Sequence, residues 1–191
     1  MSSQQTLITT HSVETPSGRI SYASAGFGPV ALFVHGVVLN KHLWRHQLAG
    51  LSDIRRCYEF RVVTEAGAAA LAARQADESD IAAIQSAWDE LERVIETQGI
   101  GAKDDFAFHL AIARASHNQF FITVMSFIEE QVVFSMNLSR NLSLVKTLER
   151  QRLVQAEHLE VLEAIRAHDA DRAGRAMAAH LQNALDRMFG S

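Results

Sequence analysis

Cysteine and proline are almost absent from this sequence. The single cysteine, Cys57, excludes an internal disulfide, and both prolines, Pro16 and Pro29, precede residue 30. No apolar run approaches the roughly 20 residues of a membrane span, and the first thirty residues lack the basic-then-apolar pattern of a secretion signal. We therefore expect a cytoplasmic protein without a membrane segment.

Basic charge is also scarce in the longer part of the chain. Residues 1–56 carry five Lys or Arg and two acids, a charge of +3, so the overall charge of −4 leaves −7 on residues 57–191. An acidic domain is a poor partner for a phosphate backbone. We therefore expect no direct binding of nucleic acid by this chain.

Residues 57–191 have the alanine content and the apolar periodicity of amphipathic helices. The pattern predicts six helices: one over 58–76, one capped by Ser79 that stops near Gly99, one ending near Ser116, one capped by Asn118, one over about 144–168 and one over about 170–188, with a break at 137–143. Six helices without proline favour a mainly α fold, an antiparallel bundle.

One aspartate and three histidines have the placement of a metal site. Asp105 and His109 are four residues apart and share a helix face, while His158 and His180 follow on two later helices. All three histidines have apolar neighbours at helical spacing, so they point inward and need polar partners. Separate core histidines bonded to carbonyls would satisfy this need. A shared site for Zn²⁺, Ni²⁺, Mn²⁺ or Fe²⁺ is favoured because all four residues fall in one small domain.

Several blocks of this segment, in order, resemble the FCD domain, the C-terminal effector domain of FadR-type GntR transcriptional regulators. They are Tyr58 to Arg61 with Thr64 and Glu65, Asp105 to Asn118, Glu157 to Ala173, and Met177 to Leu181. The resemblance covers about 57–188. It implies that Asp105, His109, His158 and His180 hold a divalent cation (Zn, Ni or Mn). It further implies that a small carboxylate binds in the bundle and that the domain forms a homodimer.

Two further residues are candidates for contact with that carboxylate. By resemblance, Arg61 points into the cavity, where its planar guanidinium would bind a carboxylate through two hydrogen bonds. A surface arginine lying over the end of the bundle is the equally weighted alternative. Asn118 is a second candidate ligand contact, although its position before an apolar helix is explained by an N-cap.

The first 56 residues have a different character and predict a short β-rich fragment. Residues 7–13 and 20–23 flank a Pro-Ser-Gly turn and predict a hairpin, and residues 30–34 form an apolar run typical of a buried strand. The run is followed by His35-Gly36 and then Trp44, and the segment 7–56 resembles the N-terminus of α/β-hydrolases. We therefore place a domain boundary between residues 56 and 57.

No hydrolase activity is expected from this fragment. The chain contains no Gly-x-Ser-x-Gly elbow and no later strand that would supply an acid and a histidine. Nor do residues 1–56 contain the winged helix that normally precedes an FCD domain, so a fusion, a truncated reading frame and a chimera all stay open. The alternatives to a sensor domain are a metal-dependent enzyme and a structural dimerisation module. The enzyme would need an inward general base, and Asp104, Glu157 and Glu160 show no inward placement in the sequence pattern.

Overall fold

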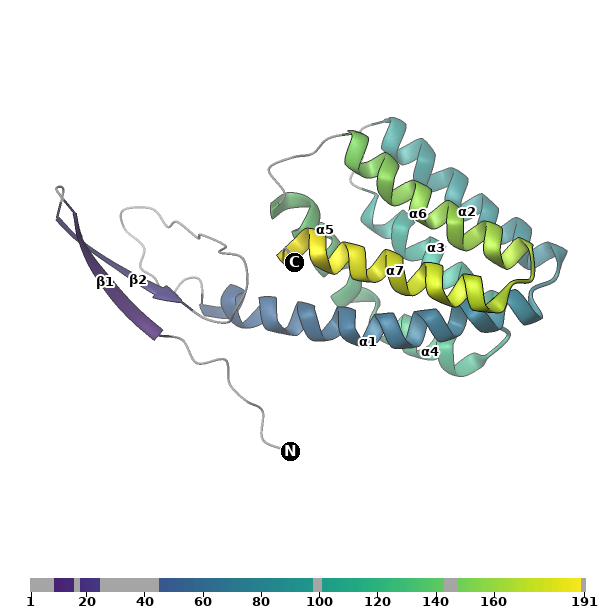
Figure 1. Cartoon of the computed structure of the whole chain (residues 1–191), viewed down its shortest axis with the longest axis horizontal. Helices are drawn as coiled ribbons and strands as arrows, with labels where there is room; N and C mark the ends of the chain where they lie inside the picture. Colours follow the sequence, from purple (N-terminus) through teal and green to yellow (C-terminus); the bar gives the residue numbers. More distant parts are fainter. Residues whose placement is uncertain (1–8, 16–17, 25–44, 98–100, 143–147, 190–191) are drawn as a thin grey trace.

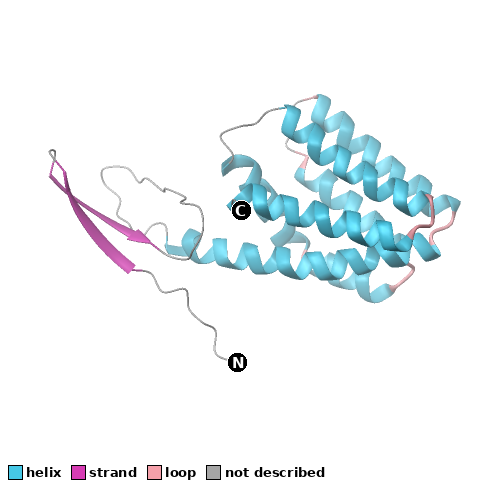
Figure 2. Ribbon diagram, viewed as in Figure 1, coloured by secondary structure: helices cyan, strands magenta, loops and turns pink. Residues whose placement is uncertain are grey.

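The computed structural model describes residues 9–15, 18–24, 45–97, 101–142 and 148–189, and it is mainly helical. Two strands, β1 (Thr9–Thr15) and β2 (Gly18–Ser24), precede the helices α1 (Arg45–Gln75), α2 (Glu78–Glu96), α3 (Ala102–Ala115), α4 (Gln119–Phe127), α5 (Glu129–Leu142), α6 (Leu148–Arg166) and α7 (Ala170–Phe189). The helices form one bundle, and the strands lie beside the N-terminal end of α1 (Figures 1 and 2). This confirms the predicted fold class.

The predicted N-terminal hairpin is present. β1 and β2 pair antiparallel, with Thr9 opposite Ser24 and Thr15 opposite Gly18. His11 stacks on Tyr22 across the pair, and its Nε2 lies 2.8 Å from the hydroxyl of Ser24. The apolar run at 30–34, with His35 and Gly36 after it, lies outside the described residues, and the hydrolase-like fragment stays a prediction.

The first helix is longer than the sequence pattern indicated. α1 begins at Arg45 rather than at residue 58 and continues for 31 residues. It therefore runs without interruption through the expected domain boundary at 56 and 57. The change in composition at this point was a poor guide to the start of the helix, because five of the ten glycines lie beyond it and α1 itself contains Gly50 and Gly67. Proline is absent from residue 30 onward, so it does not mark the start of α1 either.

Two other predictions about the helices, the cap of α2 and the break at 137–143, were wrong. Asp77, and not Ser79, caps α2, because its carboxylate accepts hydrogen bonds from two backbone N–H groups of the first turn and Asp80 reciprocates. The expected break at 137–143 falls largely within α5, and the interruption comes earlier, at Ile128. Seven helices are therefore described instead of six. Neither proline nor glycine lies near Ile128, so the strongest helix-breaking residues do not signal this interruption.

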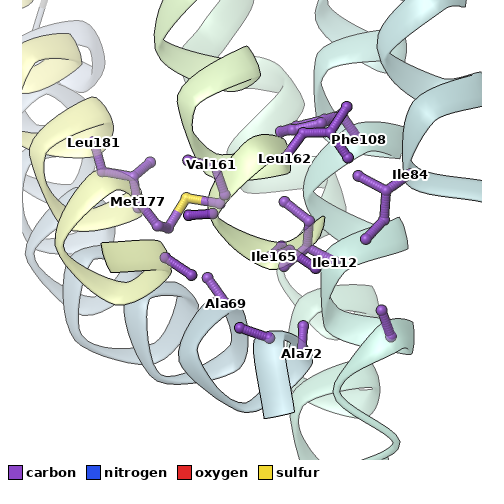
Figure 3. Close-up of a cluster of buried hydrophobic side chains, with 14 of the residues drawn as sticks. Ala69, Ala72, Ile84, Phe108, Ile112, Val161, Leu162, Ile165, Met177 and Leu181 are labelled. Carbon is purple, nitrogen blue, oxygen red and sulfur yellow. The ribbon is translucent and has the colours of Figure 1, made fainter. Parts of the chain in front are cut away.

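The main core lies between α1, α2, α3, α6 and α7. Figure 3 shows side chains from these five helices meeting in one cluster, among them Ala72, Ile84, Ile112, Leu162 and Met177. Alanines on α1 allow α7 to approach closely. At Gly174 an added Cβ would lie 3.3 Å from the carbonyl oxygen of Ala66 on α1. A smaller cluster joins α3 to α4 and α5. This packing fixes the positions of α1, α3, α6 and α7, which carry the candidate site.

No helix in the described ranges combines the length and the apolar character that crossing a membrane requires.

Candidate metal centre

The four residues predicted as metal ligands lie together in the bundle interior. Asp105 and His109 come from α3, His158 from α6 and His180 from α7, and all four are buried. One ligand nitrogen from each of the three histidines lies within 4.8 Å of those of the other two. The side chains therefore form one cluster and not three separate core positions.

The ring nitrogens Nε2 of this cluster face one another. The Nε2 atoms of His158 and His180 are 3.2 Å apart, and Asp105 Oδ1 lies 3.4 Å from His109 Nε2 and 3.9 Å from His158 Nε2. Two nitrogens bound to one tetrahedral metal at bond lengths of about 2.0–2.1 Å would be about 3.3 Å apart. The observed spacing therefore matches that of ligand atoms around a single cation.

Each histidine turns its other nitrogen, Nδ1, toward an oxygen atom. His109 Nδ1 lies 2.5 Å from Glu65 Oε2, His158 Nδ1 lies 3.1 Å from Gln155 Oε1, and His180 Nδ1 lies 2.9 Å from Glu157 Oε2. The Gln155 amide is fixed in this orientation because its nitrogen donates to the backbone oxygen of Trp88. All three oxygens accept hydrogen bonds, so these contacts favour the tautomer with the hydrogen on Nδ1, although the close His109–Glu65 contact is an ion pair without hydrogen-bond geometry.

The position of these hydrogens determines the chemistry of the centre. A neutral imidazole carries one hydrogen, so three rings protonated on Nδ1 present three lone pairs at Nε2. The Asp105 carboxylate adds a negative oxygen to the same space. Acceptors this close together repel one another unless a proton or a metal cation lies between them. The arrangement can therefore hold a cation, and carboxylate or amide partners on Nδ1 are typical of histidines that bind metals.

A buried ion pair lies next to the histidines. Arg61 and Glu65, four residues apart on α1, are both buried, and Arg61 Nε lies 2.5 Å from Glu65 Oε1. The guanidinium carbon lies 4.9 Å from the centroid of the Tyr58 ring. The two terminal nitrogens of Arg61, Nη1 and Nη2, are buried and have no hydrogen-bond partner among the described residues. Arg61 therefore lies in the interior, and the surface alternative is wrong.

Charge pairing outweighs burial for the acids of the site. Burial alone would raise the pKa of Glu65, but the charges of Arg61 and His109 lower the pKa to about 2. The same holds for Glu157. Burial would raise its pKa, but its contacts with His180 and Arg187 lower the pKa to about 2. Both carboxylates are therefore ionised at neutral pH and can hold a hydrogen on the facing imidazole nitrogen.

The remaining predicted residue, Asn118, lies elsewhere. Its side-chain oxygen accepts a hydrogen bond from the Phe120 N–H at 3.0 Å, which makes it the N-cap of α4, as its sequence position indicated. It lines a shallow surface depression with Leu71 and Gln75 of α1, and the histidine cluster does not include it. The geometry gives Asn118 a structural role, and its contact with a ligand stays a prediction.

The sequence interpretation missed the partners of the histidines. Glu157 was expected to point away, yet it contacts His180 and also receives two hydrogen bonds from Arg187. Glu65 and Gln155 were not singled out. A usable signal was present for both. Arg61 and Glu65 have the four-residue spacing of a helical ion pair, and Gln155 lies three residues before His158 on the same helix.

Comparison of the sequence with models of protein families identifies the family to which this chain belongs. Residues 56–183 match the FCD domain over about two thirds of the chain. The chain belongs to the FCD domain family. The predicted resemblance over 57–188 is thereby confirmed for the helical part, and the expected start of the FCD domain agrees with the matched start to within one residue.

Curated relatives of this FCD domain are bacterial regulators. The chain is 35% identical over 139 residues to the HTH-type transcriptional regulator LutR of Bacillus subtilis, covering 72% of this chain and 63% of that protein. It is 36% identical over 124 residues to the putative L-lactate dehydrogenase operon regulatory protein of Escherichia coli, covering 64% of this chain and 46% of that protein. The chain therefore spans about half to two thirds of the length of these relatives.

Solved structures agree on the fold. Streptococcus agalactiae GntR superimposes with a TM-score of 0.57 at 18% identity, covering 70% of this chain and 58% of that one. E. coli McbR/YncC gives the same TM-score at 22% identity, covering 73% of this chain and 67% of that one. At these identities the likeness establishes the helical architecture of the FCD domain and nothing about its ligands.

Proposed function

We propose that this FCD domain is the metal-dependent, carboxylate-sensing effector domain of a GntR-type transcriptional regulator. One observation supports the metal: three imidazoles whose Nδ1 atoms face oxygen atoms direct three Nε2 atoms and one carboxylate toward a common point. His109, His158, His180 and Asp105 would hold a divalent cation there. Three nitrogens and one oxygen suit Zn²⁺, Ni²⁺ or Mn²⁺.

Arg61 supports the proposal that the ligand is a carboxylate. A buried guanidinium whose Nη1 and Nη2 lack a protein partner is suited to two parallel hydrogen bonds with a carboxylate. The name of the E. coli relative points to lactate metabolism, so L-lactate is the first ligand to test. The metal would act as a Lewis acid toward the same ligand, and Arg61 would fix its orientation.

The charge of the site favours a ligand with a single negative charge. Asp105, Glu65 and Glu157 contribute three negative charges, and Arg61 and Arg187 contribute two positive ones. A divalent cation changes the sum from −1 to +1, which a monocarboxylate neutralises. We therefore expect L-lactate to bind more tightly than malonate, and calorimetry on the metal-loaded protein compares them directly. Tighter binding of malonate would contradict this charge balance.

A homodimer is proposed from the outer surface of α1, α4 and α5. These helices expose large apolar side chains, namely Phe60, Val63, Phe120, Phe127 and Phe134. Phe127 is 85% exposed and Phe120 is 83% exposed, which is costly for two aromatic residues of one short helix unless a partner covers them. Phe127→Ser should shift the mass in solution from dimer toward monomer, whereas Leu159→Ser on α6 serves as the control.

Catalysis and direct DNA binding are not part of this proposal. Apart from the proposed ligand Asp105, the carboxylates that approach the histidines are Glu65 and Glu157. Each is held by an arginine and an imidazole, so neither is available as a general base. The charge of −7 on residues 57–191 disfavours DNA. Operator-specific binding that persists at 0.2 M salt in a gel shift by this chain would contradict the second statement.

Metal analysis tests the central proposal. The purified protein should contain about one divalent ion per chain, and calorimetry should show saturable binding of Zn²⁺ or Ni²⁺ to chelator-treated protein. Asp105→Ala should abolish or strongly weaken this binding. Asp104→Ala is the matched control, because it removes a neighbouring acid of α3 that lies outside the cluster. Equal metal binding by both variants, or none by the unmodified protein, would refute the site.

A further inference from the structure

Glu65 contacts both functional parts of the site. Its Oε1 lies 2.5 Å from Arg61 Nε, and its Oε2 lies 2.5 Å from His109 Nδ1. With 3% of its surface exposed, Glu65 is shielded from water, so these two groups dominate its surroundings. The carboxylate therefore joins the guanidinium proposed for the ligand to one of the imidazoles proposed for the metal.

The second carboxylate of the site is connected differently. Glu157 contacts His180 Nδ1 at 2.9 Å, and its other partners are Arg187 and Asn183 near the end of α7. Glu157 is thus matched to Glu65 in its contact with an imidazole, but its contacts do not include Arg61. This pair of acids provides an internal comparison within one protein.

We propose that Glu65 is a positioning residue that couples the ligand-binding Arg61 to the metal ligand His109. The proposal rests on the proposed function and deepens it. By holding Nε of Arg61, Glu65 leaves the two Nη atoms for an incoming carboxylate. By holding the hydrogen on His109 Nδ1, it keeps the Nε2 lone pair directed at the cation.

The coupling between ligand and metal binding follows because the negative charge of Glu65 is shared between two partners. In the ligand-free site, Glu65 divides its negative charge between Arg61 and His109. A ligand carboxylate at Nη1 and Nη2 competes for the charge of the guanidinium, and Glu65 then interacts more strongly with the imidazole. A more electron-rich His109 binds the metal more tightly. By reciprocity, the metal strengthens ligand binding by the same factor.

The first arm of the test uses metal-free protein and therefore does not depend on metal binding. In protein with ¹⁵N-labelled histidine, NMR should show a low-field Nδ1–H signal for His109. Arg61→Lys keeps the positive charge but removes Nε, and it should move the His109 signal while leaving the corresponding signal of His180 in place. Glu157→Gln should do the reverse. Equal movement of both signals, or no movement of the His109 signal in Arg61→Lys, would overturn the proposal.

A single substitution in a buried ion pair leaves one charge without its partner and can prevent folding, so a second variant removes both charges. Arg61→Met combined with Glu65→Gln removes both charges while keeping similar volumes. Arg61→Met should move the His109 signal less in the Glu65→Gln background than in the unmodified protein, because the contact through Glu65 is then lost and only the direct effect of the Arg61 charge on the ring is left. A shift of equal size in the two backgrounds would contradict the proposal.

The second arm measures Zn²⁺ affinity with and without L-lactate. Both Glu65→Gln and Glu157→Gln should weaken Zn²⁺ binding by about 10- to 100-fold. L-lactate should tighten Zn²⁺ binding in the unmodified protein and in Glu157→Gln, but by a smaller factor in Glu65→Gln. An identical factor in both variants would mean that Glu65 does not couple the two sites. If no variant binds Zn²⁺, the proposed function fails, and the NMR arm still decides the role of Glu65.

Discussion

Replacing Asp105 with asparagine should have opposite effects on the metal-free and the metal-bound protein. The aspartate oxygen Oδ1 lies 3.4 Å from His109 Nε2 and 3.9 Å from His158 Nε2, and both nitrogens present lone pairs when the rings are neutral and carry their single hydrogen on Nδ1. An asparagine of the same shape can turn its N–H₂ group toward these lone pairs. Asp105→Asn should therefore stabilise the protein in the presence of a chelator and weaken its response to metal.

The size of both effects can be estimated. One new buried hydrogen bond contributes a net 0.5–1.5 kcal/mol in typical cases, so we expect about 1 kcal/mol for Asp105→Asn without metal. A domain of this size shifts its Tm by about 2–4 °C per kcal/mol. Metal at 100 times its Kd stabilises the unmodified protein by about 2.7 kcal/mol, which corresponds to about 5–11 °C. The variant should lose most of this second shift.

Thermal unfolding by calorimetry or fluorescence, with chelator and with added Zn²⁺, measures both effects on the same samples. Asp104→Asn is the control, because the same chemical change is made one residue away on α3, outside the cluster. A lower Tm for Asp105→Asn than for the unmodified protein in chelator would show that the Nε2 atoms do not present lone pairs. An undiminished response of the variant to Zn²⁺ would remove Asp105 from the metal site.

Three further predictions concern the fold. Gly67→Ala should raise the free energy of unfolding by up to about 1 kcal/mol, because the new Cβ meets only the ring of Phe121 at 3.4 Å. Gly174→Val should lower the free energy of unfolding by about 1–3 kcal/mol, because its Cβ would lie 3.3 Å from the Ala66 carbonyl oxygen and 3.4 Å from the Ala70 Cβ. Denaturant titration compares the two variants. Asp77→Ala should lower the Tm at pH 7. Hydrogen bonds from Ser79 and from the backbone lower the pKa of Asp77 below 3.8, so its stabilisation is present above that pH and the difference in Tm should vanish as the pH falls below it.

The helices and the four candidate ligands were predictable because both depend on local spacing. Asp105 and His109 share a helix face whatever the tertiary structure, and apolar neighbours place His158 and His180 on inward faces. The start of α1 was not predictable in this way. Residues 45–57 carry mixed polar and apolar side chains whose helical state depends on the continuing helix. The interruption at Ile128 was missed because no proline or glycine lies near it.

The partners on Nδ1 could not be predicted because they depend on how two helices face each other. His109 on α3 meets Glu65 on α1, and His180 on α7 meets Glu157 on α6. Sequence spacing places each acid on a helix face but says nothing about which imidazole lies opposite. Only His158 has a local partner, Gln155, at three residues on the same helix, so this contact alone could have been found from spacing.

These cross-helix contacts give the site a charge pattern that the ligands alone do not have. Four ligands with a single carboxylate would leave a divalent cation with a net charge of +1. Glu65 and Glu157 add two negative charges, and Arg61 and Arg187 cancel them. With a cation bound, the net charge would therefore stay at +1, while two of the three imidazoles contact ionised carboxylates. The arginines therefore allow strong hydrogen acceptors on Nδ1 without making the site too negative for an anionic ligand. Arg187 is held by both oxygens of Glu157, whereas Arg61 keeps two nitrogens without a protein partner. The asymmetry between the two arginines indicates on which side of the cluster an anion would bind.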